Sequence, residues 1–273
     1  MSPMTKRPAM PRAPFRLGST SYVYEADLLT NVERLATQQL VEDIELVLFE
    51  VENGPSNFPD PAAVQAMAGI AAATGVTFTA HMPRDLRHDA DSEHPSLRLA
   101  RRVIEFTRPL SPFAYVFHLD GAGIDGPGWR DQALRAVETA LRWVASPELL
   151  ALENLEHYDP AYLEPIYAAL PISRALDIGH LWKQGKGFNN LKEYGGPDRL
   201  RVVHLHGCAD GPGGWREDHL SLARMAPAQL DAAVRALAGF RGALTLEVFG
   251  EADFFSSREA LLQSYNRVTS CPA

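Results

Sequence analysis

The sequence predicts one α/β domain that folds as a closed (β/α)8 barrel, a TIM barrel. Three observations predict it. Eight short apolar runs alternate with helical patterns, the length of 273 residues suits one such barrel, and most runs end in a residue that can bind metal. Because parallel barrel strands all end at one mouth, side chains that close successive strands converge in space. The sequence therefore predicts a metal cluster at the C-terminal mouth of a barrel.

The eight apolar runs are rich in Val, Leu, Ile and Phe, as is typical of strands buried on both faces. An open doubly wound sheet is the alternative architecture, but no glycine fingerprint for a dinucleotide follows the first run. The number of runs and the convergence of their last residues favour the barrel. The expected strands are 15–20, 44–50, 76–80, 114–118, 149–153, 173–177, 201–206 and 243–248.

Helical patterns separate these runs. The clearest has Asp60 as its N-cap, Pro61 in the first turn and Gly75 as its stop. The connection from His180 to about Pro197 has the weakest periodicity. Further helices are expected at 26–40, 96–107, 130–145, 160–170, 226–240 and 256–268. Residues 1–14 contain several prolines and no periodicity, so we expect a disordered leader before a catalytic barrel at 15–273.

Composition narrows the classes of function. The net charge is −8 and no cluster of Lys and Arg with interleaved aromatic residues occurs, so general binding of nucleic acid is not expected. No apolar run approaches the roughly 20 residues of a membrane-spanning helix, and the N-terminus lacks the apolar segment of a secretory signal. Two cysteines form no disulfide framework, which makes the cytoplasm the expected location.

Nine residues of metal-binding type recur along the chain, mostly at the ends of expected strands. Each alone has an ordinary structural role, such as a hydrogen-bonded rim histidine, but the set is harder to explain that way. With imidazoles, carboxylates and no thiolate it suits Zn²⁺, Mn²⁺ or Fe²⁺. Nine ligands suit two or three divalent ions with bridging carboxylates. The residues are His81, His118, Glu153, Asp177, His180, His204, Glu217, His219 and Glu247.

Two metal ions about 3.5–4 Å apart can generate a hydroxide and clamp the entering and leaving oxygens of an in-line displacement at phosphorus. The ions also attract a negative phosphodiester despite an acidic surface. Hydrolysis of a phosphodiester is therefore the reaction class that the predicted cluster indicates.

The motifs AHMP, VFHLD, ALENLE, LDIGH, VVHLH, EDH and LTLEVF make the chain resemble the xylose-isomerase-like barrel superfamily, which includes endonuclease IV, over roughly residues 15–250. The resemblance implies three metal sites, the first two of which share Glu153. The first would use His81, His118 and Glu153, the second Glu153, Asp177, His204 and Glu247, and the third His180, Glu217 and His219. The family has Asp where this chain has Glu217, so Asp218 is an alternative ligand.

Two N-terminal segments narrow the resemblance to one group of enzymes within this superfamily: LGSTSYVYEADLLTNVERL and VEDIELVLFE. They resemble the cobamide-remodelling phosphodiesterases of the CbiR type. That resemblance implies an enzyme that opens the nucleotide loop of a cobamide, releases α-ribazole and leaves the phosphate on the corrinoid. A corrinoid is therefore the expected partner.

For this reaction we expect a hydroxide between the first two metals to attack phosphorus. Glu153 would bridge the ions and Glu247 would orient or deprotonate the water. His180 and His219, with the third metal, would neutralise charge on the phosphoryl oxygens or the leaving oxygen. Asp120 and His206 lie two residues beyond ligands, which predicts supporting contacts, although His206 is also an alternative to His204 as a ligand.

Substrate contacts are expected from loops at the same mouth. Asn154 and His157 either contact substrate or begin a helix, and no role is assigned to His88 and His94, in a polar stretch. Thr20 also has the alternative role of ending the first strand with Ser21, and both tryptophans follow Asp-Gly-Pro-Gly turns that are common anywhere. The candidates are Ser19, Thr20, Tyr22, Glu50, Trp129 and Trp215.

Three other functions compete with this prediction. A sugar isomerase or epimerase would need one ion, held by Glu153, Asp177, His204 and Glu247, and would leave His81, His118 and the EDH segment idle. An abasic-site endonuclease fits the ligands but not the acidic chain. A metal-bound corrinoid- or sugar-binding protein is the non-enzyme alternative, because the fold alone does not decide function.

Overall fold

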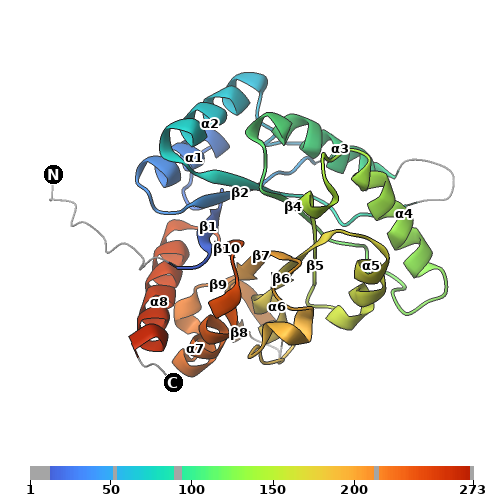
Figure 1. Cartoon of the computed structure of the whole chain (residues 1–273). Coiled ribbons are helices and arrows are strands. Elements are labelled where there is room, and N and C mark those ends of the chain that lie inside the picture. Colours follow the sequence, from blue (N-terminus) through green and yellow to red (C-terminus); the bar gives the residue numbers. More distant parts are fainter. Residues whose placement is uncertain (1–12, 52–53, 89–93, 212–214, 271–273) are drawn as a thin grey trace.

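The computed structural model describes residues 13–51, 54–88, 94–211 and 215–270. Eight parallel strands close into a barrel in the order β1-β10-β7-β6-β5-β4-β3-β2 (Figure 1). The predicted barrel is confirmed. Its strands are β1 (Arg16–Thr20), β2 (Asp43–Val47), β3 (Thr77–His81), β4 (Ala114–Phe117), β5 (Leu150–Glu153), β6 (Ser173–Asp177), β7 (Leu200–Leu205) and β10 (Ala243–Leu246).

Helices surround the barrel, as Figure 1 shows. Asp60 caps α2 by accepting a hydrogen bond from the Ala63 N–H, and Gly75 ends it with φ of 80°, so the predicted start and stop of this helix are confirmed. The α-helices are α1 (Leu28–Thr37), α2 (Pro61–Thr74), α3 (Pro95–Thr107), α4 (Trp129–Leu141), α5 (Glu164–Ala169), α6 (Ile178–Lys183), α7 (Pro227–Ala236) and α8 (Glu251–Ser270). None of these is both long and apolar enough to cross a membrane.

Short 3-10 helices supplement them. The helix expected over 160–170 divides into η3 (Pro160–Leu163) and α5, and the weakly periodic sixth connection holds only α6 and η4 (Leu191–Tyr194). The others are η1 (Arg108–Leu110), η2 (Pro147–Leu149), η5 (Leu222–Arg224) and η6 (Leu237–Gly239). The segment 1–12 of the expected leader lies outside the described residues.

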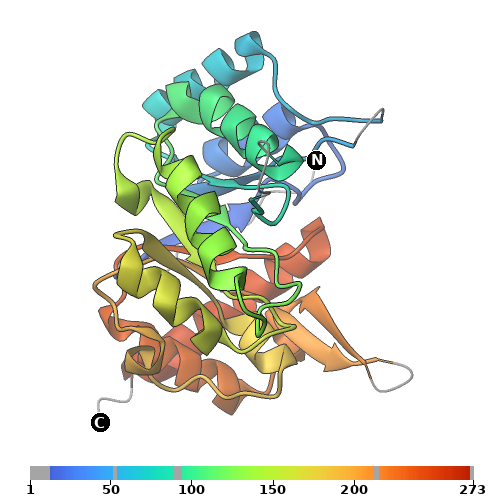
Figure 2. The ribbon, with the colours of Figure 1, turned by 90° about the vertical axis from the view of Figure 1, so that its right-hand side faces the viewer.

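One element was not expected. Directly after β7 the chain forms an antiparallel hairpin of β8 (Gly207–Asp210) and β9 (Arg216–Leu220), where the sequence predicted only a loop. The hairpin extends from the barrel to the same side as the connection that follows β2 (Figure 2). It therefore stands beside the mouth where the strands end.

The barrel interior explains how such short strands bring the ligands together. A small apolar cluster fills the middle of the barrel. Strand side chains alternate between faces, so the residue two positions after a cluster member lies on the same face, and at several strands this residue is polar. The cluster members Val116, Ala151, Ala175 and Val202 precede His118, Glu153, Asp177 and His204 in this way. The registers reinforce the convergence, since Asp177 of β6 pairs with His204 of β7. Apolar filling below and ligands above define the mouth.

Candidate metal centre

The deepest group of ligands consists of Glu153, Asp177, His204 and Glu247, which are all buried and whose ligand atoms lie within 4.8 Å of one another. They come from the ends of neighbouring strands β5, β6, β7 and β10. Nδ1 of His204 lies 2.8 Å from Oε1 of Glu153 and 3.2 Å from Oε2 of Glu247. A divalent ion fits among these atoms by the chemistry of the set, three carboxylates and one imidazole.

A second group adjoins the first and shares Glu153 with it. His81 at the end of β3 and His118 just beyond β4 complete this group. Oε2 of Glu153 lies 2.8 Å from Nε2 of His118 and 3.4 Å from Nε2 of His81. The two oxygens of Glu153 thus face different groups, so one carboxylate would be available to both.

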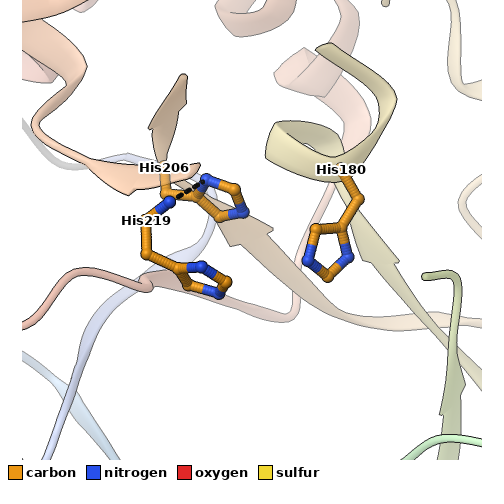
Figure 3. A group of neighbouring side chains, drawn as sticks. All are labelled: His180, His206 and His219. Atoms are coloured by element: carbon orange, nitrogen blue, oxygen red, sulfur yellow. Dashed lines mark hydrogen bonds between the residues drawn. The ribbon is translucent and has the colours of Figure 1, made fainter. Parts of the chain in front are cut away.

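A third group is made of histidines: His180 from α6, His206 between β7 and β8, and His219 from β9 (Figure 3). The rings of His206 and His219 stack with centroids 4.3 Å apart, and the ring of His180 lies 5.4 Å from that of His206. Nδ1 of His206 contacts backbone, 3.0 Å from the His219 N–H nitrogen and 3.1 Å from the Gly207 carbonyl. Its Nε2 is left facing Oδ2 of Asp177 at 3.2 Å, which connects the third group to the first.

Glu217 does not join this group, although the resemblance placed it there with His180 and His219. The expectation assumed an extended loop in which residues 217 and 219 point the same way. In the hairpin, two steps along β8 from Gly207 to Ala209 are matched by three steps along β9 from Leu220 to Glu217, and His219 has φ of 53°. Such a bulge re-aims side chains, so His219 turns to the histidines and Glu217 does not.

Asp218 lies beside the third group instead. Its Oδ1 is 3.5 Å from Nδ1 of His219, and its Oδ2 accepts a hydrogen bond from Lys183 at 2.7 Å. Lys183 also donates to Glu156 at 3.0 Å, and Glu156 reaches His180 at 3.6 Å. Burial raises the pKa of Asp218, but His219 and Lys183 together hold it well below its usual range. Glu156, His180 and Asp218 form a further possible ligand group that shares His180.

A glycine makes room for the third group. A Cβ on Gly179 would lie 2.2 Å from Cε1 of His206, far inside contact distance. Gly179 belongs to the LDIGH segment, so the same turn that supplies Asp177 and His180 also admits the ring of His206. Of the two residues between these ligands, Gly179 is therefore restricted to glycine by packing.

Three residues at the site were not expected from the sequence: Glu45, Glu156 and Lys183. Glu45 is wholly buried inside β2, where its Oε2 lies 2.8 Å from Nε2 of His204. An acidic residue within the apolar run IELVLFE was the available signal. Glu156 and Lys183 carried none, because they meet only through the fold.

The charges of the site compensate one another. Burial lowers the pKa of His118, but the negative charges of Glu153 and Asp85 outweigh burial and raise it to about 10. Burial likewise opposes ionisation of Glu153, yet His204 and His118 hold its pKa well below the usual value. Divalent cations bound here would supply positive charge to the same carboxylates.

Buried polar atoms without a hydrogen bond support the binding of metal ions at this site. Nε2 of His81, Oδ2 of Asp177, Nε2 of His206 and Oε2 of Glu247 are buried. Although Nε2 of His206 faces Oδ2 of Asp177 at 3.2 Å, none of the four makes a hydrogen bond to a described residue. Buried polar atoms are normally satisfied, and these converge from all three groups. Metal coordination would satisfy them.

The predicted substrate residues divide by exposure. Ser19 and Thr20 are fully buried, and the Thr20 hydroxyl donates to the Val248 carbonyl at 3.0 Å, so both lie in the packing of the barrel. Glu50 forms an ion pair with Arg102 of α3 at 2.5 Å. Tyr22 is half-buried at the mouth and accepts a hydrogen bond from Asn57.

The two tryptophans differ as well. Trp129 is only 9% exposed and its indole N–H donates to the Asp120 carbonyl at 2.6 Å, so it packs in the core and does not form a wall of the mouth. Trp215 is 56% exposed on the hairpin. The supporting contact expected of Asp120 is absent among the described residues, because its carboxylate pairs with Arg87.

Asn154 has a structural role. Its side-chain amide donates to the Asp177 carbonyl at 3.0 Å and accepts from the Asp177 N–H at 2.9 Å. It thereby anchors the end of β6. His94 caps α3 through Ser96. His157 is exposed beside Glu156.

Fold and site define a (β/α)8 barrel whose mouth carries three adjoining groups of possible metal ligands. No protein-family model and no curated protein matches the chain. Solved structures do match. A D-tagatose 3-epimerase-like protein superposes with a TM-score of 0.72 at 18% identity, over 94% of this chain and 99% of its own.

Endonuclease IV from Thermus thermophilus matches with a TM-score of 0.64 at 18% identity, over 93% of this chain and 99% of that one. A 3-keto-D-glucoside 4-epimerase from E. coli matches with a TM-score of 0.58 at 15% identity, over 94% and 100%. At such identities the likeness shows the fold. The chain shares the barrel fold of these three proteins.

Proposed function

We propose that the protein is a metal-dependent phosphodiester hydrolase that opens the nucleotide loop of adenosylcobamides and related cobamides, giving cobinamide phosphate and α-ribazole. The observation that carries this proposal is the sharing of Glu153. Its two oxygens face two ligand groups, His81 with His118 on one side and His204 on the other. A bridged pair of ions with a third site nearby suits displacement at phosphorus. Zn²⁺ and Mn²⁺ are the ions that the donors suit best, with Fe²⁺ as a further candidate.

In this reaction the oxygen of a water molecule bonds to phosphorus while the bond from phosphorus to the ribose O3′ breaks. One proton of the water ends on O3′, and the phosphate stays on the corrinoid. Divalent ions bound at the site would activate the water and neutralise the phosphate charge. We assign to Glu247, whose Oε2 lies 3.2 Å from His204 and 3.6 Å from His219, the orientation of the water and the acceptance of its proton. We assign to His180 and His219, with a third ion, the neutralisation of charge on the phosphoryl oxygens or on the leaving oxygen.

A sugar isomerase or epimerase is the second candidate. The wholly buried group of Glu153, Asp177, His204 and Glu247 is the one-ion set that such a reaction needs, and epimerases are among the proteins with this fold. However, that reaction leaves His81, His118 and the three-histidine group without a role. The additional ligand groups therefore favour phosphodiester hydrolysis.

The choice of a cobamide as the substrate is supported by the resemblance of the N-terminal segments to cobamide-remodelling phosphodiesterases. Cleavage of abasic DNA would also use the ligand groups, and endonuclease IV shares the fold. A net charge of −8 opposes it, because neutralised phosphates supply most of the affinity for duplex DNA.

One comparison tests the proposal. A metal-quantified preparation would receive adenosylcobalamin, an abasic-site duplex and a panel of ketoses, with products identified by mass spectrometry. We expect α-ribazole and cobinamide phosphate. Interconversion of a ketose, or nicking of DNA without cleavage of the corrinoid, would overturn the proposed substrate. Binding of corrinoid without turnover in the metal-loaded protein would indicate a binding protein.

A further inference from the structure

Three aromatic side chains gather at the barrel mouth, one from the end of each of three neighbouring strands. Tyr22 follows β1, Phe49 follows β2 and Phe249 follows β10. The ring of Tyr22 lies 6.5 Å from both Phe49 and Phe249, between them. We call these three residues the aromatic rim.

The rim is exposed although it is apolar. Phe49 is 36% exposed and Phe249 is 46% exposed, and they are two of only five large apolar side chains so exposed among the described residues. Grouped exposed apolar side chains mark binding surfaces. Their position beside the ligand groups makes that surface part of the same mouth.

The rim is also held in place. Asn57 donates to the Tyr22 hydroxyl at 2.9 Å and to the Val47 carbonyl at 2.8 Å, and its carbonyl oxygen accepts the Phe49 N–H at 2.7 Å. The Gly250 N–H donates to the Tyr22 carbonyl at 2.9 Å, which joins the segment that carries Phe249. One asparagine and one backbone contact therefore hold the Tyr22 hydroxyl and the backbone beside Phe49 and Phe249.

The rim adjoins the third ligand group. The ring of Phe249 lies 5.6 Å from the ring of His219, tilted by 38°. In the proposed reaction this group neutralises charge on the phosphoryl oxygens or on the leaving O3′, and a nucleoside that leaves on this side would contact the rim. The base of that nucleoside is flat and aromatic, which matches ring faces. A corrin with its many amide side chains needs polar partners, and the rings of Phe49 and Phe249 offer none.

We propose that the aromatic rim binds the base of the leaving nucleoside, through contact of its faces with Phe249 and its neighbours. This inference rests on the proposed function and adds to it an assignment of the two substrate halves: the α-ribazole half against the rim, the corrin half elsewhere on the mouth. Phe249 is then a binding residue that sets preference among cobamides with different bases.

The two products separate the two halves of the substrate and provide the test. Calorimetric titration of the metal-loaded protein with α-ribazole and, separately, with cobinamide phosphate would be compared for wild type, Phe249→Leu and Phe249→Tyr. The leucine keeps apolar volume without a ring, and the tyrosine keeps the ring. We expect Phe249→Leu to weaken binding of α-ribazole by about tenfold or more, the range of stacking on one base. Phe249→Tyr should retain it, and binding of cobinamide phosphate should be unchanged in both.

Weakened binding of cobinamide phosphate alone would place the corrin on the rim and overturn the assignment, and unchanged binding of both products would show that the rim binds neither. Metal content and circular dichroism equal to wild type establish that each variant is folded. Phe49→Leu gives a second, independent measurement on the same surface. If the wild type cleaves adenosylcobalamin but Phe249→Leu does not weaken the binding of α-ribazole, only the base assignment is wrong. Absence of that cleavage would sink the proposed function and the base assignment with it.

Discussion

Glu45 and His204 are joined inside the barrel: Oε2 of Glu45 lies 2.8 Å from Nε2 of His204, and both side chains are wholly buried. The other ring nitrogen of His204 faces Glu153 and Glu247. A carboxylate that accepts the second N–H of a ligating histidine fixes the tautomer and the ring orientation. Glu45 thus supports the deepest ligand group from the opposite side of the ring.

We expect Glu45→Ala to lower metal affinity by about 10–100-fold, the usual effect of removing such a supporting contact. Glu45→Gln should lose less, because its amide oxygen still accepts the N–H of His204. Metal content after dialysis against a graded chelator measures both variants. Equal retention of metal by wild type and Glu45→Ala would remove this role from Glu45.

Gly179→Ala should disrupt the three-histidine group, since the new methyl would occupy the space of the His206 ring. We expect loss of about one metal equivalent and of turnover. Gly69→Ala is the matched control, because Gly69 lies in α2 and no atom lies within 4 Å of the position that its new methyl would take. That control should be neutral or stabilise the protein by about 0.5–1 kcal/mol. Metal analysis and thermal unfolding of both variants check the prediction, and full metal content in Gly179→Ala would contradict it.

Asp218 and Glu217 should differ in their effect on catalysis. Asp218→Asn weakens the contacts to His219 and Lys183 and should lower turnover and binding of the third metal. Glu217→Gln should leave both near wild type, because Glu217 belongs to none of the ligand groups. His219→Ala should reduce turnover more than it reduces stability. Turnover, metal content and thermal unfolding of the three variants provide the comparison. If Glu217→Gln proves the more damaging of the two carboxylate variants, the hairpin geometry does not describe the metal-loaded site.

Glu153→Gln should abolish hydrolysis and lower metal content while the barrel remains folded. The amide cannot provide two anionic oxygens to two groups, and the neighbouring imidazoles lose the charge that now holds their pKa values high, as at His118, with a pKa of about 10. Product formation, metal analysis and circular dichroism provide the measurements. Full activity in this variant would exclude a bridging carboxylate at position 153.

Asp43, buried at the start of β2, predicts a dependence of stability on pH. Burial raises its pKa to about 6, against the hydrogen bond from Thr77. The folded state therefore retains a proton that the unfolded chain, with a pKa of 3.8, has lost. Stability is consequently lost as pH rises from about 4 to above 6.

Asp43→Asn should remove this loss of stability with rising pH. The asparagine side chain stays neutral, and its amide oxygen can still accept the hydrogen bond from Thr77. The stability of the variant relative to wild type should increase by about 1.4 kcal/mol between pH 5 and pH 7.5. Urea unfolding of both proteins at the two pH values measures the difference. A constant difference would show that Asp43 does not titrate in this range.

Much of the fold was predictable because it depends on local patterns. Short apolar runs rich in Val, Leu, Ile and Phe indicated the eight strands, and the cap at Asp60 with the stop at Gly75 indicated α2. The strand ends also predicted that Glu153, Asp177 and His204 converge, since the last inward side chains of parallel strands meet at one mouth. Residue type and spacing are sufficient where the backbone is regular.

The amino-acid sequence by itself thus determined the barrel, its metal-binding residue types and the mouth at which they meet. The tertiary structure alone decided that His206 joins His180 and His219 in place of Glu217, that Glu45 supports His204, and that the aromatic rim borders the third group. A bulge and a positive φ at His219 change side-chain direction in a way that spacing does not encode. Contacts such as Gly179 with His206 arise between segments that only the closed barrel brings together, because their energy depends on packing and not on local pattern.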